Sequence, residues 1–118
     1  MTGKDILELD DRQYEDVEVP EWHRAIRIRS LSLGDRLRVE ALTPAGASGD
    51  VWLLFQTTVV QLSATNGDGN LLFTADDVPA LADKNPLAIN RIFWAAIRIN
   101  KMRAEDVEEL QRNFTKAP

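Results

Sequence analysis

The sequence predicts an α+β fold, mainly α, in one compact domain. We expect an N-terminal β-hairpin, a small second hairpin or turn near residues 63–73, and about four to five helices. Apolar and charged residues alternate over 17–29, as in half-buried strands. From residue 32 onward the apolar residues recur at the longer spacing of helices. The length of 118 residues fits one domain with a substantial core.

The composition argues against several classes of function. The formal net charge of −5 argues against nucleic acid as the main partner, because phosphate binding requires clustered Lys and Arg. Cysteine is absent, which excludes disulfides and thiolate metal sites, and no catalytic constellation surrounds the single histidine, His23. The longest apolar run, "VWLLF", is too short to cross a bilayer, and the acidic N-terminus lacks a signal-peptide core. We therefore expect a soluble, intracellular, non-enzymatic protein that binds other proteins and needs no cofactor or metal.

The domain organisation follows from charge and apolar content. Residues 1–16 are predicted to be an acidic, flexible N-terminal arm, since they carry few large apolar side chains. Residues 17–113 are predicted to form the single domain, and 114–118 a short C-terminal tail.

The hairpin is predicted from two stretches of period two, 17–19 and 26–29, joined by a loop over 20–25. Glu18 on one strand and Arg27 and Arg29 on the other would give the hairpin a charge-complementary solvent face.

The first helix of the domain is predicted to begin after Ser32, which forms a capping box with Asp35 three residues on. Its buried stripe would consist of Leu33, Leu37, Ala41 and Leu42. Two glycines and a proline in "TPAGASGD", residues 43–50, predict a flexible linker after it.

Two longer helices are expected to supply the core. The segment 51–62 carries β-branched residues that favour a strand, but its length and its Val51, Phe55, Val59 and Leu62 spacing favour a buried helix that includes Trp52. Asn85 and Pro86 are a cap and first residue typical of a helix start, predicting a helix over 86–100. Its buried face would be Ile89, Ile92, Phe93, Ala96 and Ile97. A last helix, 104–113, would bury Val107 and Leu110.

The stretch "NGDGNLLFTADDV", residues 66–78, begins like a calcium-binding loop. A twelve-residue EF-hand loop needs glycine at position 6 and glutamate at position 12. If Asn66 is position 1, Leu71 and Asp77 occupy those places, and if Gly69 is the glycine, the loop begins at Ala64 and ends at Ala75. Turn chemistry is therefore favoured over metal binding, with Thr74 and Asp77 capping the next helix. A calcium-regulated module remains a third hypothesis.

Several segments, taken in order, resemble the tail assembly chaperones of long-tailed phages, over about residues 17–112. They are "VEVPEW" with "IRIRSLSLGDR", then "VQLSATNGDGNLLFTADDV", and finally "INRIFWAAIRIN" followed by "VEEL". The chain departs from the family at the hairpin tip, where His23 and Arg24 replace small glycine-like residues. It departs again at Pro79 and at Asn85, where a helix-compatible residue and a Ser cap are usual.

The resemblance implies a non-catalytic role in tail assembly, in a phage or prophage. Such proteins bind the tape measure protein, keep its long hydrophobic chain soluble, and help to recruit major tail tube subunits. It further implies a homo-oligomer in the host cell cytoplasm that is absent from the mature virion and has no nucleic acid or membrane partner. Many members also have a longer form made by ribosomal frameshifting, and this chain has the size of the short form. The alternative is a structural virion protein, either a tail completion or a head-tail connector component.

Partner binding is predicted at the polar face of the 86–100 helix, where a tryptophan lies between two arginines. Packing of Trp94 under the linker or the arm is an equally weighted alternative. Trp22 at the hairpin tip raises the same choice, with packing favoured. The predicted partner-binding residues are Trp22, Leu87, Arg91, Trp94 and Arg98.

Overall fold

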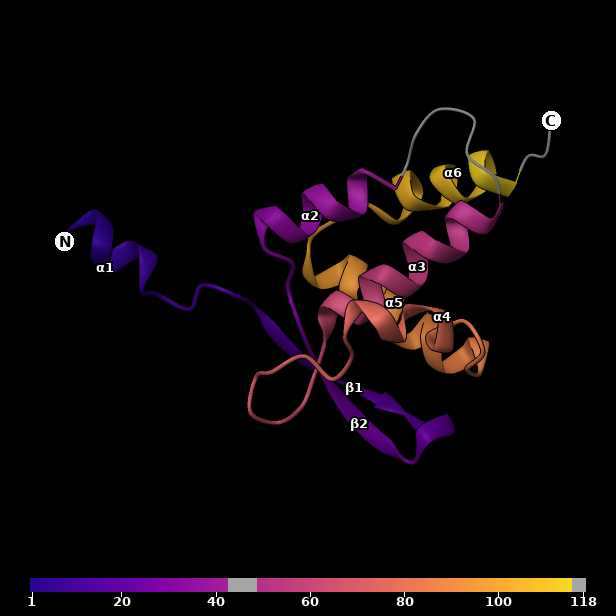
Figure 1. Ribbon diagram of the computed structural model, residues 1–118, viewed down its shortest axis with the longest axis horizontal. Coiled ribbons are helices and arrows are strands. Elements are labelled where there is room, and N and C mark those ends of the chain that lie inside the picture. Colours follow the sequence, from indigo (N-terminus) through magenta and orange to yellow (C-terminus); the bar gives the residue numbers. More distant parts are fainter. Residues whose placement is uncertain (43–48, 116–118) are drawn as a thin grey trace.

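The computed structural model describes residues 1–42 and 49–115. Within these residues the chain forms six α-helices and a three-stranded antiparallel sheet in the order β1-β2-β3. The helices lie to one side of the hairpin, and the N-terminal arm projects away from the body (Figure 1). The predicted class, α+β and mainly α, is confirmed. No helix in the described segments combines the length and the apolar content needed to span a bilayer.

The N-terminal hairpin is confirmed, with longer strands than predicted. Strand β1 spans Tyr14–Val19 and β2 spans Arg24–Arg29, with Tyr14 opposite Arg29 and Val19 opposite Arg24. A single 3₁₀ turn, η1 (Pro20–Trp22), and His23 join them. His23 has φ of 56°, a left-handed conformation that glycine adopts without strain. Glycine-like residues, which are typical of the resembled family at this point, would adopt this backbone conformation with less strain than histidine.

The charges on the hairpin are arranged differently from the prediction. Arg27 pairs with Asp16 directly opposite it, at 2.9 Å, whereas Glu18 lies opposite Ala25. Arg29 does not face solvent: its side chain is 17% exposed, and its Nε donates to the carbonyl of Leu62. Burial, followed by the nearby charge of Arg12, lowers the pKa of Arg29.

Helix α2 (Leu33–Glu40) begins at the predicted capping box, in which Ser32 and Asp35 bond each other's backbone amides. The predicted apolar stripe is wrong. Leu33 is 77% and Leu37 is 58% exposed, Ala41 is also exposed, and Leu42 is only half-buried. The buried positions are Asp35 and Val39, one turn apart on the other face.

The orientation of α2 follows from a cluster around the buried Asp35 carboxylate. Arg12 approaches it at 3.3 Å and Arg29 at 3.9 Å. Arg12 also donates to the carbonyl of Ser30 at 2.8 Å. Because a buried charge is tolerated only when it is paired, Asp35 must face these arginines, and the leucines on the opposite face are turned outward.

The core lies between two helices, as predicted. Helix α3 (Gly49–Ser63) buries Trp52, Phe55, Val59 and Leu62, and helix α5 (Pro86–Ile99) buries Ile89, Ile92, Phe93, Ala96 and Ile97. Asn85 caps α5 by accepting a hydrogen bond from the amide of Leu87 at 2.9 Å. Helix α5 therefore lies between α3 and the hairpin, and both of its neighbours contact it.

The stretch 66–78 is a turn followed by a helix start. Asn66 Oδ1 accepts from the amides of Asp68 and Asn70, and Gly69 has φ of 86°. The strand before the turn, β3 (Ala64–Thr65), pairs with β2, so the predicted second hairpin is part of the same sheet. Asp77 accepts from the amide of Thr74 at 2.8 Å at the start of a 3₁₀ turn, η2 (Ala75–Asp77). Helix α4 (Val78–Leu81) tolerates Pro79 in its first turn.

The two ends of the chain are helical. Helix α1 (Gly3–Leu7) lies in the predicted arm and buries no residue. Helix α6 (Ala104–Thr115) buries Val107, as predicted, whereas the side chain of Leu110 and the tail residues 116–118 lie outside the described residues. The predicted linker over 43–50 falls mostly on residues 43–48, which also lie outside them.

Candidate partner-binding site

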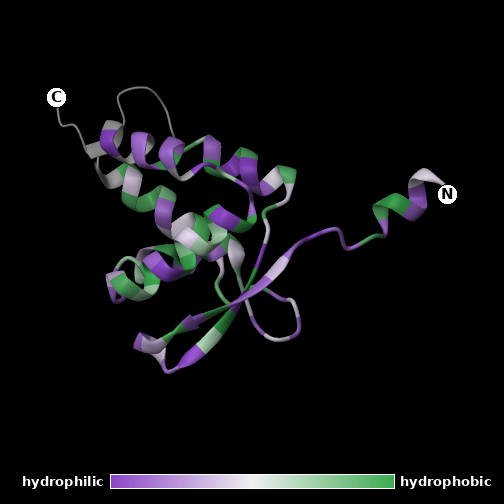
Figure 2. Ribbon diagram, turned by 180° about the vertical axis from the view of Figure 1, so that it is seen from behind, coloured by the Kyte–Doolittle hydropathy of each residue, from purple (hydrophilic) through white to green (hydrophobic). Residues whose placement is uncertain are grey.

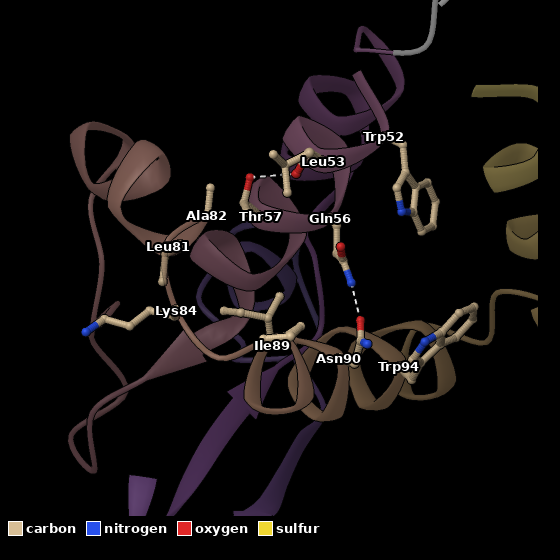
Figure 3. Close-up of a pocket in the computed structure, with 11 residues that line it drawn as sticks. Trp52, Leu53, Gln56, Thr57, Leu81, Ala82, Lys84, Ile89, Asn90 and Trp94 are labelled. Atoms are coloured by element: carbon tan, nitrogen blue, oxygen red, sulfur yellow. Dashed lines mark hydrogen bonds between the residues drawn. The ribbon is translucent and has the colours of Figure 1, made fainter. Parts of the chain in front are cut away.

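A groove of about 270 Å³ lies between α3, α4 and α5. Figure 3 shows the side chains that line it, which come from all three helices and from the segment that joins α4 to α5. They are Trp52, Leu53, Gln56, Thr57, Leu81, Ala82, Lys84, Pro86, Ile89, Asn90 and Trp94. Seven of the eleven are apolar and one, Lys84, is charged, which is a composition typical of protein-binding surfaces.

Aromatic rings form the wall of the groove on one side. Trp52 of α3 stacks on Phe55 with ring centroids 5.6 Å apart, and meets the edge of Phe93 at 5.5 Å. Trp94 of α5 makes a similar edge contact with Phe93 at 5.1 Å. Phe93 is fully buried, and Trp94 is half-buried. The buried rings therefore fix the position of Trp94 while part of its indole remains open to a partner.

One polar bridge crosses the groove. Gln56 of α3 donates a hydrogen bond to Asn90 of α5. Trp52 and Trp94 lie on one side of this bridge, and Leu81, Ala82 and Lys84 lie on the other (Figure 3). The two amides leave hydrogen-bonding capacity free, since each has donors and acceptors beyond this bond. The groove thus offers two apolar subsites separated by amides that can orient a bound segment.

The structure separates the predicted partner-binding residues into two groups. Trp94 and Leu87 remain available, with Trp94 in the groove and Leu87 58% exposed at the start of α5. The two arginines instead bind the hairpin: Arg91 donates two hydrogen bonds to Glu21, at 2.8 and 3.1 Å, and Arg98 donates two to Glu15. Trp22 is half-buried against the core and lines a different hollow.

The contact between Arg91 and Glu21 connects α5 to the hairpin tip. Hydrogen bonding from the Arg91 guanidinium lowers the pKa of the Glu21 carboxyl and raises the pKa of Arg91 itself. Because the folded-state pKa of Glu21 lies below its unfolded value, this stabilisation is present above about pH 4.3 and is lost as the pH falls through the folded value.

Acid is therefore expected to release the hairpin tip. The indole N–H resonance of Trp22, next to Glu21 in η1, should shift as the pH is lowered below about 4, and this shift should be absent in Glu21→Gln. A titration followed by two-dimensional nitrogen-proton NMR measures it. The same titration of Trp22 in both proteins would show that Glu21 is not the responsible group.

Comparison with solved structures finds a protein with a similar fold. The chain is similar to the bacteriophage HK97 tail assembly chaperone, with a TM-score of 0.64 and 17% sequence identity. The match covers 81% of this chain and 90% of the HK97 chain. This chain has the fold of a phage tail assembly chaperone. No protein-family model and no curated protein sequence matches it.

Several groove residues were not among those predicted from the sequence. Leu53 of α3 lines the groove, is 43% exposed and follows the buried Trp52. All five residues of "VWLLF" are apolar, so its helical wheel has no polar face that would mark the exposed side. Lys84 and Asn90 carried no local signal, because they meet the groove only through the packing of α4 and α5 against α3.

Across residues 1–42 and 49–115, no group of three or more potential metal-binding side chains lies together. The acidic residues of the 66–78 stretch act as turn and helix caps: Asp77 bonds the backbone of Thr74, and Asn66 bonds the turn.

Proposed function

We propose that this protein is a tail assembly chaperone of a long-tailed phage or prophage, and that its client is the tape measure protein. It keeps the client soluble in the host cell cytoplasm and helps to recruit major tail tube subunits around it. The observation that carries the proposal is a fold shared with the HK97 tail assembly chaperone over 81% of the chain. The ordered succession of sequence segments from 17 to 112 supports it independently.

The groove between α3, α4 and α5 supports binding of an apolar helical segment. Its lining includes the exposed Leu53 and the half-buried Trp94. Exposed apolar side chains gathered at a groove are typical of protein-protein contacts, and an amphipathic helix places side chains into such a groove every three or four residues. A tape measure chain, being long and apolar, supplies many such segments.

Trp94→Ala should weaken binding of the tape measure protein, or self-association, more than it lowers stability. We expect a loss of about 2 kcal/mol or more in binding free energy, roughly thirtyfold in affinity, as for an aromatic hot spot, against about 1 kcal/mol in the free energy of unfolding. Affinity is measured by titration calorimetry and stability by urea denaturation. Trp94→Phe, which keeps an aromatic ring, is the matched control and should retain most of the affinity. Equal losses of fold and binding, or unchanged binding, would contradict the assignment.

Mass spectrometry of purified particles separates a chaperone from a structural virion protein. A chaperone acts during assembly and should be absent from finished virions, whereas a tail completion or connector component remains in them. The gene offers a second check. A slippery heptanucleotide near its 3′ end, with an overlapping frame and a very long helical reading frame downstream, is expected for a member made in two lengths.

A further inference from the structure

The hydrogen bond from Gln56 to Asn90 divides the groove between α3, α4 and α5 into layers. On α3, Gln56 lies four residues after Trp52, and on α5, Asn90 lies four residues before Trp94. Four residues of helix rise about 6 Å. Both helices therefore place an indole about one turn from the amide bridge, and the two indoles lie on the same side of it (Figure 3). A helix bound along the groove presents its side chains with the same one-turn repeat.

The layer on the other side of the bridge carries a positive charge. The lining residue Pro86 lies one turn before Asn90 on α5, on the side away from Trp94, and Lys84 precedes it by two residues. Lys84 is exposed and makes no ion pair with a described residue. A single cation beside apolar side chains is complementary to an acidic side chain of a partner.

The bridge leaves part of both amides unpaired. It uses one N–H of Gln56 and the side-chain carbonyl of Asn90. The side-chain carbonyl of Gln56 and the amino group of Asn90 form no hydrogen bond with a described residue. This acceptor and donor are complementary to the carboxamide of a glutamine or an asparagine, which donates to the first and accepts from the second. An apolar side chain at the same place would leave both groups without a partner.

The amide bridge interrupts walls that are otherwise mainly apolar. Hydrophobic residues, drawn in green, make up much of α3 and α4 (Figure 2). The packing of α3 against α5 is already supplied by the aromatic cluster around the buried Phe93. The bridge lies outside that cluster, with Asn90 exposed and Gln56 half-buried, so its contribution to stability is modest. A polar group within an apolar helix contact does set the register of the two helices, as a single asparagine does in a coiled coil.

We propose that the groove selects a client helix by three side chains spaced one turn apart on its apolar face. They are a bulky apolar residue at the indoles, a glutamine or asparagine at the bridge, and an acidic residue at Lys84. The amide fixes the register of the bound helix, and the charge at Lys84 fixes its direction. This inference rests on the proposed function, since it describes the segments of the tape measure protein that bind. A long apolar client is then bound at segments with this pattern and not wherever it is apolar.

Peptides that together cover the tape measure protein of the same genome test the pattern. Each has about 20 residues, because shorter helices are marginal in water. Fluorescence anisotropy of the labelled peptides measures their binding to the unmodified full chain. The tightest-binding peptide should carry the three-residue pattern. Replacing its glutamine or asparagine with leucine should weaken binding by about tenfold, because the two amides of the groove are then covered without a partner.

Changing the bridge itself should reverse this preference. Gln56→Leu with Asn90→Leu should bind the leucine peptide about tenfold more tightly than the amide peptide. Reversal is a result that loss of structure cannot produce, and the peptide pair on the unmodified chain needs no variant at all. Gln13→Leu with Asn70→Leu makes the same two changes at exposed positions outside the groove and should keep the original preference. Circular dichroism checks that both variants fold.

Lys84→Glu tests the charged layer. It should weaken binding of the peptide that carries the acidic residue, and changing that residue to lysine should restore binding. Lys84 also lines the hollow at the hairpin tip, whereas Arg24 lines that hollow but not the groove. Arg24→Glu is therefore the matched control and should bind the peptide as the unmodified chain does. Equal losses in Lys84→Glu and Arg24→Glu would overturn the assignment of Lys84 to the groove.

Failure of this inference is distinct from failure of the proposed function. Equal affinity of the unmodified chain for the amide and leucine peptides would overturn the inference and leave the proposed function standing, because the client is then bound without selection. Binding of no peptide, with the whole tape measure protein still kept in solution, would also overturn it. A tape measure protein that this chain does not keep in solution would contradict the proposed function and, with it, this inference.

Discussion

Phe93→Ala is expected to lower the free energy of unfolding by about 3–5 kcal/mol, the loss typical when a fully buried phenylalanine is cut back to alanine. Phe93 is 0% exposed and touches the rings of Trp52, Phe55 and Trp94, with centroids between 5.1 and 5.9 Å away. Removing it leaves a cavity between α3 and α5 and takes away the surface on which Trp94 rests. Urea denaturation followed by tryptophan fluorescence measures the loss.

Leu87→Ala is the matched control, since Leu87 lies on the same helix and is 58% exposed. It should change stability by no more than about 0.5 kcal/mol. Phe93→Leu, which fills part of the cavity, should fall between the two. A Phe93→Ala variant as stable as Leu87→Ala would show that the aromatic cluster does not hold α3 and α5 together.

Asp35→Ala should cost about 2–4 kcal/mol, because it leaves Arg12 and Arg29 without their shared carboxylate in a mostly buried site. The Asp35 side chain is 9% exposed, and those of Arg12 and Arg29 are 23% and 17% exposed. The variant also loses the hydrogen bond from the Ser32 amide that begins α2. Urea denaturation again gives the free energy.

Two further variants show how much of the stability loss comes from the buried negative charge of Asp35. Asp35→Asn keeps an oxygen that can accept hydrogen bonds but removes the charge, so it should be intermediate. Asp16→Ala breaks an exposed aspartate-arginine pair and should leave the denaturation midpoint almost unchanged, because solvent screens that pair. Equal midpoints for Asp35→Ala and Asp16→Ala would mean that the buried cluster contributes little.

The parts of the fold that the sequence predicted are those set by local chemistry. The capping box at Ser32, the cap at Asn85 and the turn from Asn66 all depend on residues within a few positions of each other. The face of α2 depends instead on Arg12, which lies 23 residues before Asp35, and on Arg29 at the end of strand β2. An alignment of leucines on a helical wheel carries no information about that cluster, which is why the predicted stripe was wrong.

The candidate site was likewise predictable only in part. The buried face of α5 could be predicted from the helical spacing of its apolar residues, and Trp94 does line a groove. That Arg91 and Arg98 bind Glu21 and Glu15 of the hairpin could not be predicted, because it depends on the hairpin packing beside α5. These two pairs connect α5 to the hairpin.

Co-expression with the tape measure protein encoded by the same genome tests the central claim most directly. The measured quantity is the fraction of tape measure protein that stays in solution after centrifugation, with and without this chain. The proposed function predicts that the tape measure protein is largely insoluble alone, and is soluble and co-elutes with this chain when both are expressed. A tape measure protein that is equally insoluble in the presence of this chain would contradict it.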